Sequence, residues 1–152
     1  VYFHDFYFLY YLSICCCIIQ VKETGYDPNR SRISDNKMAN WKAAKIGGDD
    51  ITEVPGVGPA AARALAGANL EPDDRIETTW QLFAKYMSYF GKDVDTYEAT
   101  NRFWHFLANR GINSHRSAIV RAVGEKLAAN YDGLYDPDEY GDSDDEEEEA
   151  SS

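Results

Sequence analysis

Residues 38–135 contain no cysteine, because the three cysteines of the chain stand next to one another at positions 15–17. A disulfide framework and a cysteine-based zinc site are therefore excluded from this stretch. Histidine is also scarce, and the three histidines lack the spacing of metal ligands: His4, His105 and His115. We therefore expect no metal site and no cofactor.

Recognisable catalytic motifs are missing as well. The sequence has no P-loop, no nucleophile elbow of a Ser-His-Asp triad, and no paired acid and base that can be placed. We therefore expect a protein that is not an enzyme.

Basic residues are absent from the end of the chain. Residues 136–152 hold ten acidic side chains and no basic one, whereas residues 38–135 hold twelve acids and eleven bases. The formal net charge of -11 thus belongs to the C-terminal segment. Its carboxylates repel one another, so residues 136–152 are predicted to be a disordered acidic tail. Three roles remain open for it: keeping the protein soluble, binding histones or other basic partners, and competing with DNA for the domain's own basic face.

Residues 1–21 form an aromatic and aliphatic run of about the length of a membrane span. They lack the basic start and the small-residue cleavage site of a signal peptide. The first methionine is Met38, so we favour the interpretation that residues 1–37 are upstream sequence rather than part of the native protein. The alternative is a membrane anchor with palmitoylated cysteines at 15–17. Residues 22–37 are expected to be a flexible linker in either case.

Residues 38–135 are predicted to form one compact all-α domain, because no alternating strand pattern of useful length occurs there. The first helix is expected at about residues 59–66. Three further helices are predicted from their caps and terminating glycines: Thr78 or Thr79 to Gly91, Asp95 or Thr96 to Gly111, and one starting after Asn113 or Ser114.

Large apolar side chains at helical spacing mark the expected core. We assign to it the stripe of the second of these helices, the large apolar residues of the third and one side of the last: Trp80, Phe83, Met87 and Phe90; Tyr97, Phe103, Trp104, Phe106 and Leu107; Ile119, Val120, Val123 and Leu127. Gly124 lies within the last helix, which predicts a close approach of another helix.

Two glycines open the first predicted helix and indicate an anion site. Residues 54–58 read Val-Pro-Gly-Val-Gly, and Pro59 suits the first helical position because its missing N–H costs nothing there. With Ile51 before it, this turn resembles a helix-hairpin-helix, which grips nucleic-acid phosphates through backbone amides. The candidate contacts are the turn and the start of the helix: Gly56, Val57, Gly58, Ala60, Ala61 and Arg63.

A second glycine followed by a helix N-terminus lies at residues 111–117. Its polar side chains are further candidate phosphate contacts, with an ordinary capped helix as the alternative: Asn113, Ser114, His115 and Arg116. Lys42 and Lys45, ahead of the hairpin, are plausible additional contacts.

Residues 38–136 resemble the barrier-to-autointegration factor family. The resemblance rests on the order and spacing of four pieces: the hairpin at 54–58, the Trp-Gln-Leu-Phe segment at 80–83, the Phe-Trp-His-Phe-Leu segment at 103–107, and Gly-Ile-Asn-Ser-His-Arg-Ser at 111–117 before a final amphipathic helix. Two departures stand out. Arg63 and Ala64 occupy the places of two family lysines, and His115 replaces a third.

This resemblance implies a SAM/BAF-like helical subunit that forms a homodimer. Each subunit would present one hairpin on opposite faces, so that the dimer bridges two DNA duplexes without regard to sequence. It also implies a nuclear and cytoplasmic protein of chromatin that binds LEM-domain membrane proteins. The alternative hypothesis is a protein-interaction module whose acidic tail binds histones or another basic partner.

Overall fold

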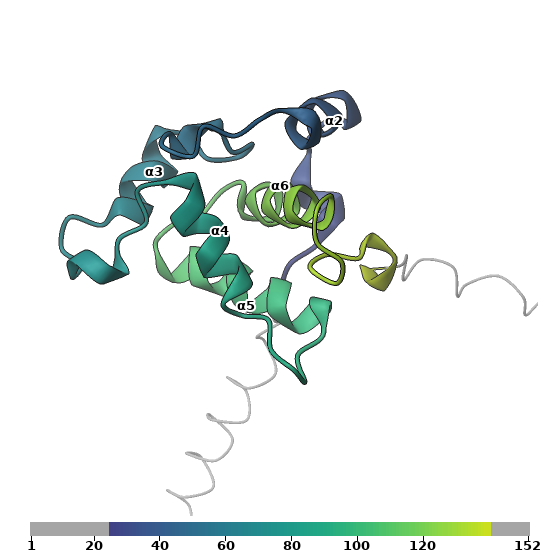
Figure 1. The fold of residues 1–152 in the computed structure, drawn as a ribbon. Helices are drawn as coiled ribbons and strands as arrows, with labels where there is room; N and C mark the ends of the chain where they lie inside the picture. Colours follow the sequence, from purple (N-terminus) through teal and green to yellow (C-terminus); the bar gives the residue numbers. More distant parts are fainter. Residues whose placement is uncertain (1–24, 141–152) are drawn as a thin grey trace, which may run out of the picture.

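The computed structural model describes residues 25–140, and within them it contains five α-helices and no β-strand (Figure 1). The predicted all-α class is therefore confirmed. The helices are α2 (Asp35–Ala43), α3 (Pro59–Ala66), α4 (Thr79–Met87), α5 (Thr96–Asn109) and α6 (Arg116–Ala128). Single turns of 3-10 helix lie at Pro28–Ser31, Ile51–Glu53, Pro72–Asp74 and Pro137–Tyr140.

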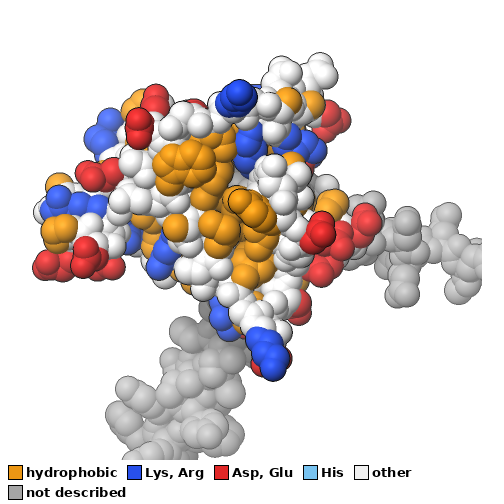
Figure 2. All heavy atoms as spheres, viewed as in Figure 1, with side chains coloured by type: hydrophobic (Ala, Val, Ile, Leu, Met, Phe, Trp, Pro, Cys, Tyr) orange, Lys and Arg blue, Asp and Glu red, His pale blue; other side chains and the backbone are white. Residues whose placement is uncertain are grey.

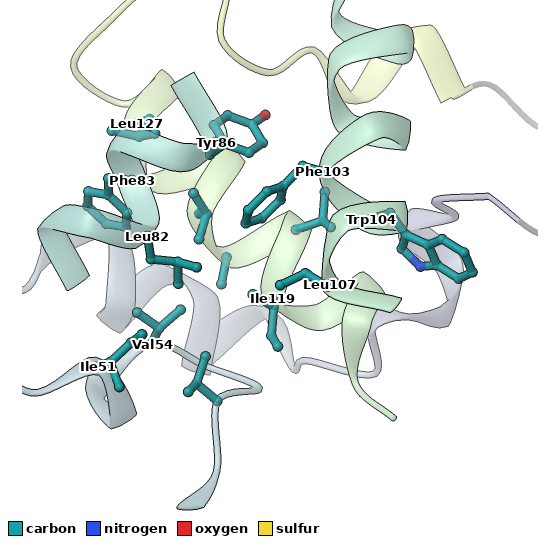
Figure 3. Close-up of a cluster of buried hydrophobic side chains, with 14 of the residues drawn as sticks. Ile51, Val54, Leu82, Phe83, Tyr86, Phe103, Trp104, Leu107, Ile119 and Leu127 are labelled. Carbon is teal, nitrogen blue, oxygen red and sulfur yellow. The ribbon is translucent and has the colours of Figure 1, made fainter. Parts of the chain in front are cut away.

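Helix α6 forms the centre of the fold. It packs against α2, α4, α5 and the 3-10 turn Pro28–Ser31. Ile119, Val120 and Val123 are completely buried, as expected from the sequence. Figure 3 shows Ile119 beside Phe103 and Leu107, while Trp104 lies at the margin of this cluster. Because α6 is surrounded, its two ends are where surface sites can form.

Two helix starts agree with their predicted caps. The Thr78 side chain accepts a hydrogen bond from the backbone N–H of Gln81, and the Gln81 side-chain oxygen accepts one from the Thr78 N–H, which completes a capping box. Asp95 caps α5 by accepting from the N–H of Glu98. Helix α3 has the predicted bounds, with Pro59 at its first position and Gly67 ending it in the left-handed region.

The predicted end of one helix and the predicted start of another were wrong. Helix α4 ends before Gly91, because Ser88 and Tyr89 donate to the carbonyls of Ala84 and Tyr86 and so close its last turn. Helix α6 is capped by neither Asn113 nor Ser114. It starts at Arg116, after His115, whose φ of 61° is in the left-handed region.

The predicted core register of α4 was wrong in part. Trp80 is 54% exposed and Met87 39% exposed, whereas Leu82 and Tyr86 are completely buried. Phe83 belongs to both registers and is buried as predicted. The inward face is thus the 82–83–86 stripe. Trp80 lies instead over Gly48, where an added Cβ would stand only 1.6 Å from the indole nitrogen.

The packed region extends beyond the predicted domain boundaries at both ends. Tyr26 is buried, and its hydroxyl lies 2.6 Å from that of Tyr135. Ser31 is also buried and accepts a hydrogen bond from Arg121. Tyr140 packs edge-on against Tyr26, with ring centres 5.0 Å apart. Residues 25–37 are therefore not a flexible linker, and residues 136–140 are not part of a disordered tail.

The predicted close approach at Gly124 is confirmed. A Cβ at this position would lie 2.6 Å from the Tyr135 ring and 3.0 Å from the Tyr86 hydroxyl. Next to it, Lys126 donates hydrogen bonds to carbonyls at the end of α2, those of Trp41 and Lys42 among them. Tertiary contacts thus join α4, α2 and the C-terminal segment to the second half of α6.

Some predictions fall on residues 1–24 and 141–152, which lie outside the described residues. They are the upstream-sequence and membrane-anchor interpretations of the N-terminal segment and the roles of the acidic tail. Among the helices of residues 25–140, none combines the length and the apolar character that crossing a membrane requires.

Candidate nucleic-acid interface

The predicted hairpin is a tight turn held by buried side chains. Ile51, Val54 and Val57 are buried, and the Val57 N–H donates to the Val54 carbonyl at 3.0 Å. The element before the turn is the single 3-10 turn Ile51–Glu53 rather than an α-helix. The element after it is α3, so the turn delivers the chain directly into a helix N-terminus.

Gly56 joins this turn to the first part of α6. Its φ is +95°, a conformation that favours glycine. An added Cβ would stand 3.0 Å from the Ile119 side chain and 3.1 Å from both the Ala118 Cβ and the Ile119 backbone nitrogen. The hairpin and the segment at 111–117 are more than fifty residues apart in the sequence. The close contact of Gly56 with the start of α6 places them side by side in the fold.

Gly58 differs from Gly56 in having no structural need to be glycine. Its φ of -92° and ψ of -179° are extended backbone that any residue can adopt. An added Cβ would have nothing within 4 Å. The glycine therefore leaves open surface beside the N-terminus of α3, where a side chain would block the approach of a ligand.

Helices α3 and α6 are the two α-helices of the described region whose N-termini have no side-chain cap. Ser34, Thr78 and Asp95 cap the other three. Within residues 25–140, the amides at the start of α3 donate to no protein acceptor: Gly56, Gly58, Ala60 and Ala61. Free N–H groups with the positive end of a helix dipole attract anions.

The polar side chains at 113–116 lie around the uncapped start of α6, where Ser117 and Ala118 are themselves buried. Asn113, Ser114 and His115 are exposed, and none makes a hydrogen bond from its side chain to another described residue. Arg116 is half-buried because its guanidinium lies on the ring of Trp104, 3.8 Å from the ring centre. Arg63 is exposed on α3 and forms no ion pair within residues 25–140.

Two acidic groups before the turn, Glu53 and Asp50, accept local hydrogen bonds. The Glu53 carboxylate accepts from the Gly48 N–H at 3.1 Å and from the Thr79 hydroxyl at 2.8 Å. Asp50 caps the 3-10 turn, and hydrogen bonds from the Thr52 hydroxyl and N–H lower the pKa of its carboxyl. These carboxylates are turned to the protein's own donors.

Lys42 lies away from the hairpin. Its ammonium forms an ion pair with Glu125 at 3.0 Å, near the C-terminal end of α6, whereas Gly56 contacts the N-terminal end. Glu125 and Arg116 are nine residues apart, which is about 13 Å along a helix. Lys45 follows Ala44, whose carbonyl also accepts from Lys126. Figure 1 shows α2 and α3 on opposite sides of the molecule. The structure therefore separates Lys42 from the hairpin, whereas Lys45 stays a predicted contact.

A groove lined by both apolar and polar side chains, Lys42, Lys126 and Asn130 among them, was not predicted from the sequence. It has a volume of about 770 Å³ and lies between the end of α2, helix α4 and the end of α6. Its lining includes exposed aromatic side chains, Trp80 and Tyr131, together with Met87, Phe83 and Leu127. Figure 2 shows hydrophobic side chains gathered near the middle of this face. The glycine pair at 47–48 could have indicated this groove, because Gly48 has no side chain and so leaves room for the indole of Trp80.

Comparison with known proteins finds no matching family model, no matching curated protein and no matching solved structure. Within residues 25–140, no group of three His, Cys, Asp or Glu side chains could hold a metal ion.

Proposed function

We propose that this protein binds double-stranded DNA without regard to sequence and bridges two duplexes as a homodimer, as a relative of barrier-to-autointegration factor in the organisation of chromatin. The observation that carries the proposal is the pair of uncapped helix N-termini, α3 and α6, that meet at Gly56. The free amides at the start of α3 suit a phosphate of the DNA backbone, and the polar side chains that precede α6 lie on the neighbouring segment.

The open surface at Gly58 supports the same function. Backbone amides can grip a phosphate only where no side chain keeps the DNA away, and the fold itself does not need a glycine here. Arg63 on α3 and Arg116 on α6 add positive charge to the two segments. Contacts of this kind fix the protein on the DNA backbone and carry no base information.

We propose that the homodimer forms through the groove between α2, α4 and α6. Exposed aromatic and methionine side chains in one hollow are typical of protein interfaces. The groove includes Lys126 and Leu127 near the end of α6, whereas the hairpin packs against Ala118 and Ile119 near its start. Pairing through the groove would thus leave the hairpin of each subunit free to hold its own duplex.

A gel shift of the full chain on short duplexes of unrelated sequence, over a salt series, tests DNA binding. We expect equal affinities for the duplexes and a steep fall with salt, since phosphate contacts release counterions. Gly58→Val should abolish binding while the helices remain folded. Lys92→Gln is the matched control, because this exposed lysine lies in the α4–α5 loop, away from α3 (Figure 1). Normal binding by a folded Gly58→Val protein would refute the hairpin assignment.

A further inference from the structure

Trp104 and Arg116 form a unit at the start of α6 that the hairpin does not include. The Arg116 guanidinium lies on the indole ring at 3.8 Å. The indole N–H points to the Ser117 hydroxyl oxygen at 3.3 Å. Trp104 is only 6% exposed, so the ring is a fixed platform rather than a mobile surface group. One aromatic side chain thus holds two consecutive residues of the first turn of α6.

Arg116 has no competing partner in the described part of the chain. It forms no ion pair there, and stacking on Trp104 is the contact that orients it. Most other arginines of residues 25–140 are engaged. Arg102 and Arg121 pair with glutamates, and Arg75 and Arg110 donate to backbone carbonyls. A stacked guanidinium keeps its N–H groups available at the ring edge while losing much of its rotational freedom.

We propose that Trp104 is a positioning residue for DNA binding: it holds the Arg116 guanidinium at the start of α6, so that Arg116 takes a second phosphate next to the one on the hairpin. This inference rests on the proposed function. It adds that the second phosphate contact is prepared in the free protein. Ordering a long side chain on binding normally costs conformational entropy and weakens affinity. For Arg116 this ordering has already taken place when the protein folds.

Removal of the charge and removal of the platform have different expected effects. Arg116→Gln should weaken duplex binding about tenfold at low salt, since it loses a charge-assisted hydrogen bond, and should lower the salt slope by about 0.9. Trp104→Leu should weaken binding about three- to fivefold through the lost preorganisation, with the salt slope unchanged. Trp104→Phe keeps an aromatic face and should recover part of that loss.

A double-mutant cycle separates positioning from a general structural role. In the Arg116→Gln background, Trp104→Leu should change affinity less than twofold, because the platform then has nothing to orient. Equal effects of Trp104→Leu in both backgrounds would overturn the inference. If Trp104→Leu does not fold, Arg116→Lys replaces it: this variant keeps the charge but stacks poorly. It should keep the salt slope and lose several-fold in affinity, and full affinity would overturn the inference.

The same experiment distinguishes failure of the inference from failure of the proposed function. The proposed function fails when the unmodified chain shows no salt-dependent duplex binding, or when Gly58→Val binds normally. The inference alone fails when Gly58→Val abolishes binding but Arg116→Gln binds DNA with the same affinity and the same salt slope as the Lys92→Gln control.

Discussion

Gly56 and Ile119 approach each other so closely that an added Cβ on the glycine would lie 3.1 Å from the isoleucine's backbone nitrogen. This approach joins the hairpin to the first turns of α6 and fixes the two open helix ends relative to each other. Gly58, two residues later, faces open space. The two glycines of the hairpin therefore have different physical roles, one in the fold and one at the surface offered to a ligand.

Substitution at these two positions should separate stability from binding. Gly56→Ala should lower the free energy of unfolding by about 1–3 kcal/mol, because alanine is strained at positive φ and its Cβ meets the α6 backbone. Gly58→Ala should leave the stability equal or raise it by about 0.5 kcal/mol, since its backbone conformation suits alanine. Urea unfolding followed by circular dichroism measures both. Equal losses at the two positions would contradict this division of roles.

Replacement of Trp80 by Glu should prevent dimer formation. The side chain is 54% exposed in the groove, and a carboxylate placed there would have to be buried in an apolar interface. Light scattering should give the mass of one chain, whereas the unmodified protein gives that of two. Tyr97→Glu, with 53% exposure outside the groove, is the matched control.

The same variant should still bind one duplex but lose bridging. A labelled duplex captured through a second, immobilised duplex would measure this. A Trp80→Glu protein that remains dimeric would place the interface elsewhere and remove the groove from the proposal.

The sequence was sufficient to predict helix α3 and the turn before it, because Pro59 and Gly67 are strong local signals for a helix start and end. It was not sufficient for the register of α4. Phe83 belongs both to an apolar stripe that includes Trp80 and to one that includes Leu82. Only tertiary packing decides which of the two stripes faces the core. The open end of α6 was also unpredictable, since Asn113 and Ser114 are good caps that the left-handed turn at His115 leaves unused.

The boundaries could not be predicted for a related reason. Residues 22–37 are polar and contain Pro28, a composition typical of linkers. Burial of Tyr26 depends on Tyr135 and Tyr140, which follow it by more than one hundred residues. A contact of that range leaves no periodic signal in the local sequence.

A chain that begins at Met38 should consequently be less stable than one that begins at Gly25. The shorter chain loses the buried Tyr26 ring, its hydrogen bond to Tyr135 and that of Ser31 to Arg121. We expect a loss of about 3 kcal/mol in the free energy of unfolding, mostly from the aromatic ring. Urea unfolding of the two chains measures it. Equal midpoints would show that residues 25–37 add nothing to the fold.

Alkaline pH should destabilise the protein through its buried tyrosines. Burial raises the pKa values of four of them above the ordinary value near 10: Tyr26, Tyr86, Tyr135 and Tyr140. A raised pKa in the folded state means that the folded protein keeps a proton that the unfolded chain releases. The resulting stability is complete below pH 10 and is lost as the pH rises toward the folded-state values.

Each of these tyrosines should add a slope of about 1.4 kcal/mol per pH unit above pH 10. Tyr26→Phe should lower the stability at pH 8 by about 1 kcal/mol, because its hydroxyl pairs with that of Tyr135 at 2.6 Å. It should also make the fall of the free energy of unfolding between pH 10 and 11 shallower, by about the contribution of one tyrosine. Tyr131→Phe is the control, since Tyr131 is 60% exposed. Parallel declines for the Tyr26 variant and the unmodified protein would mean that the Tyr26 hydroxyl ionises as readily in the folded state as in the unfolded chain.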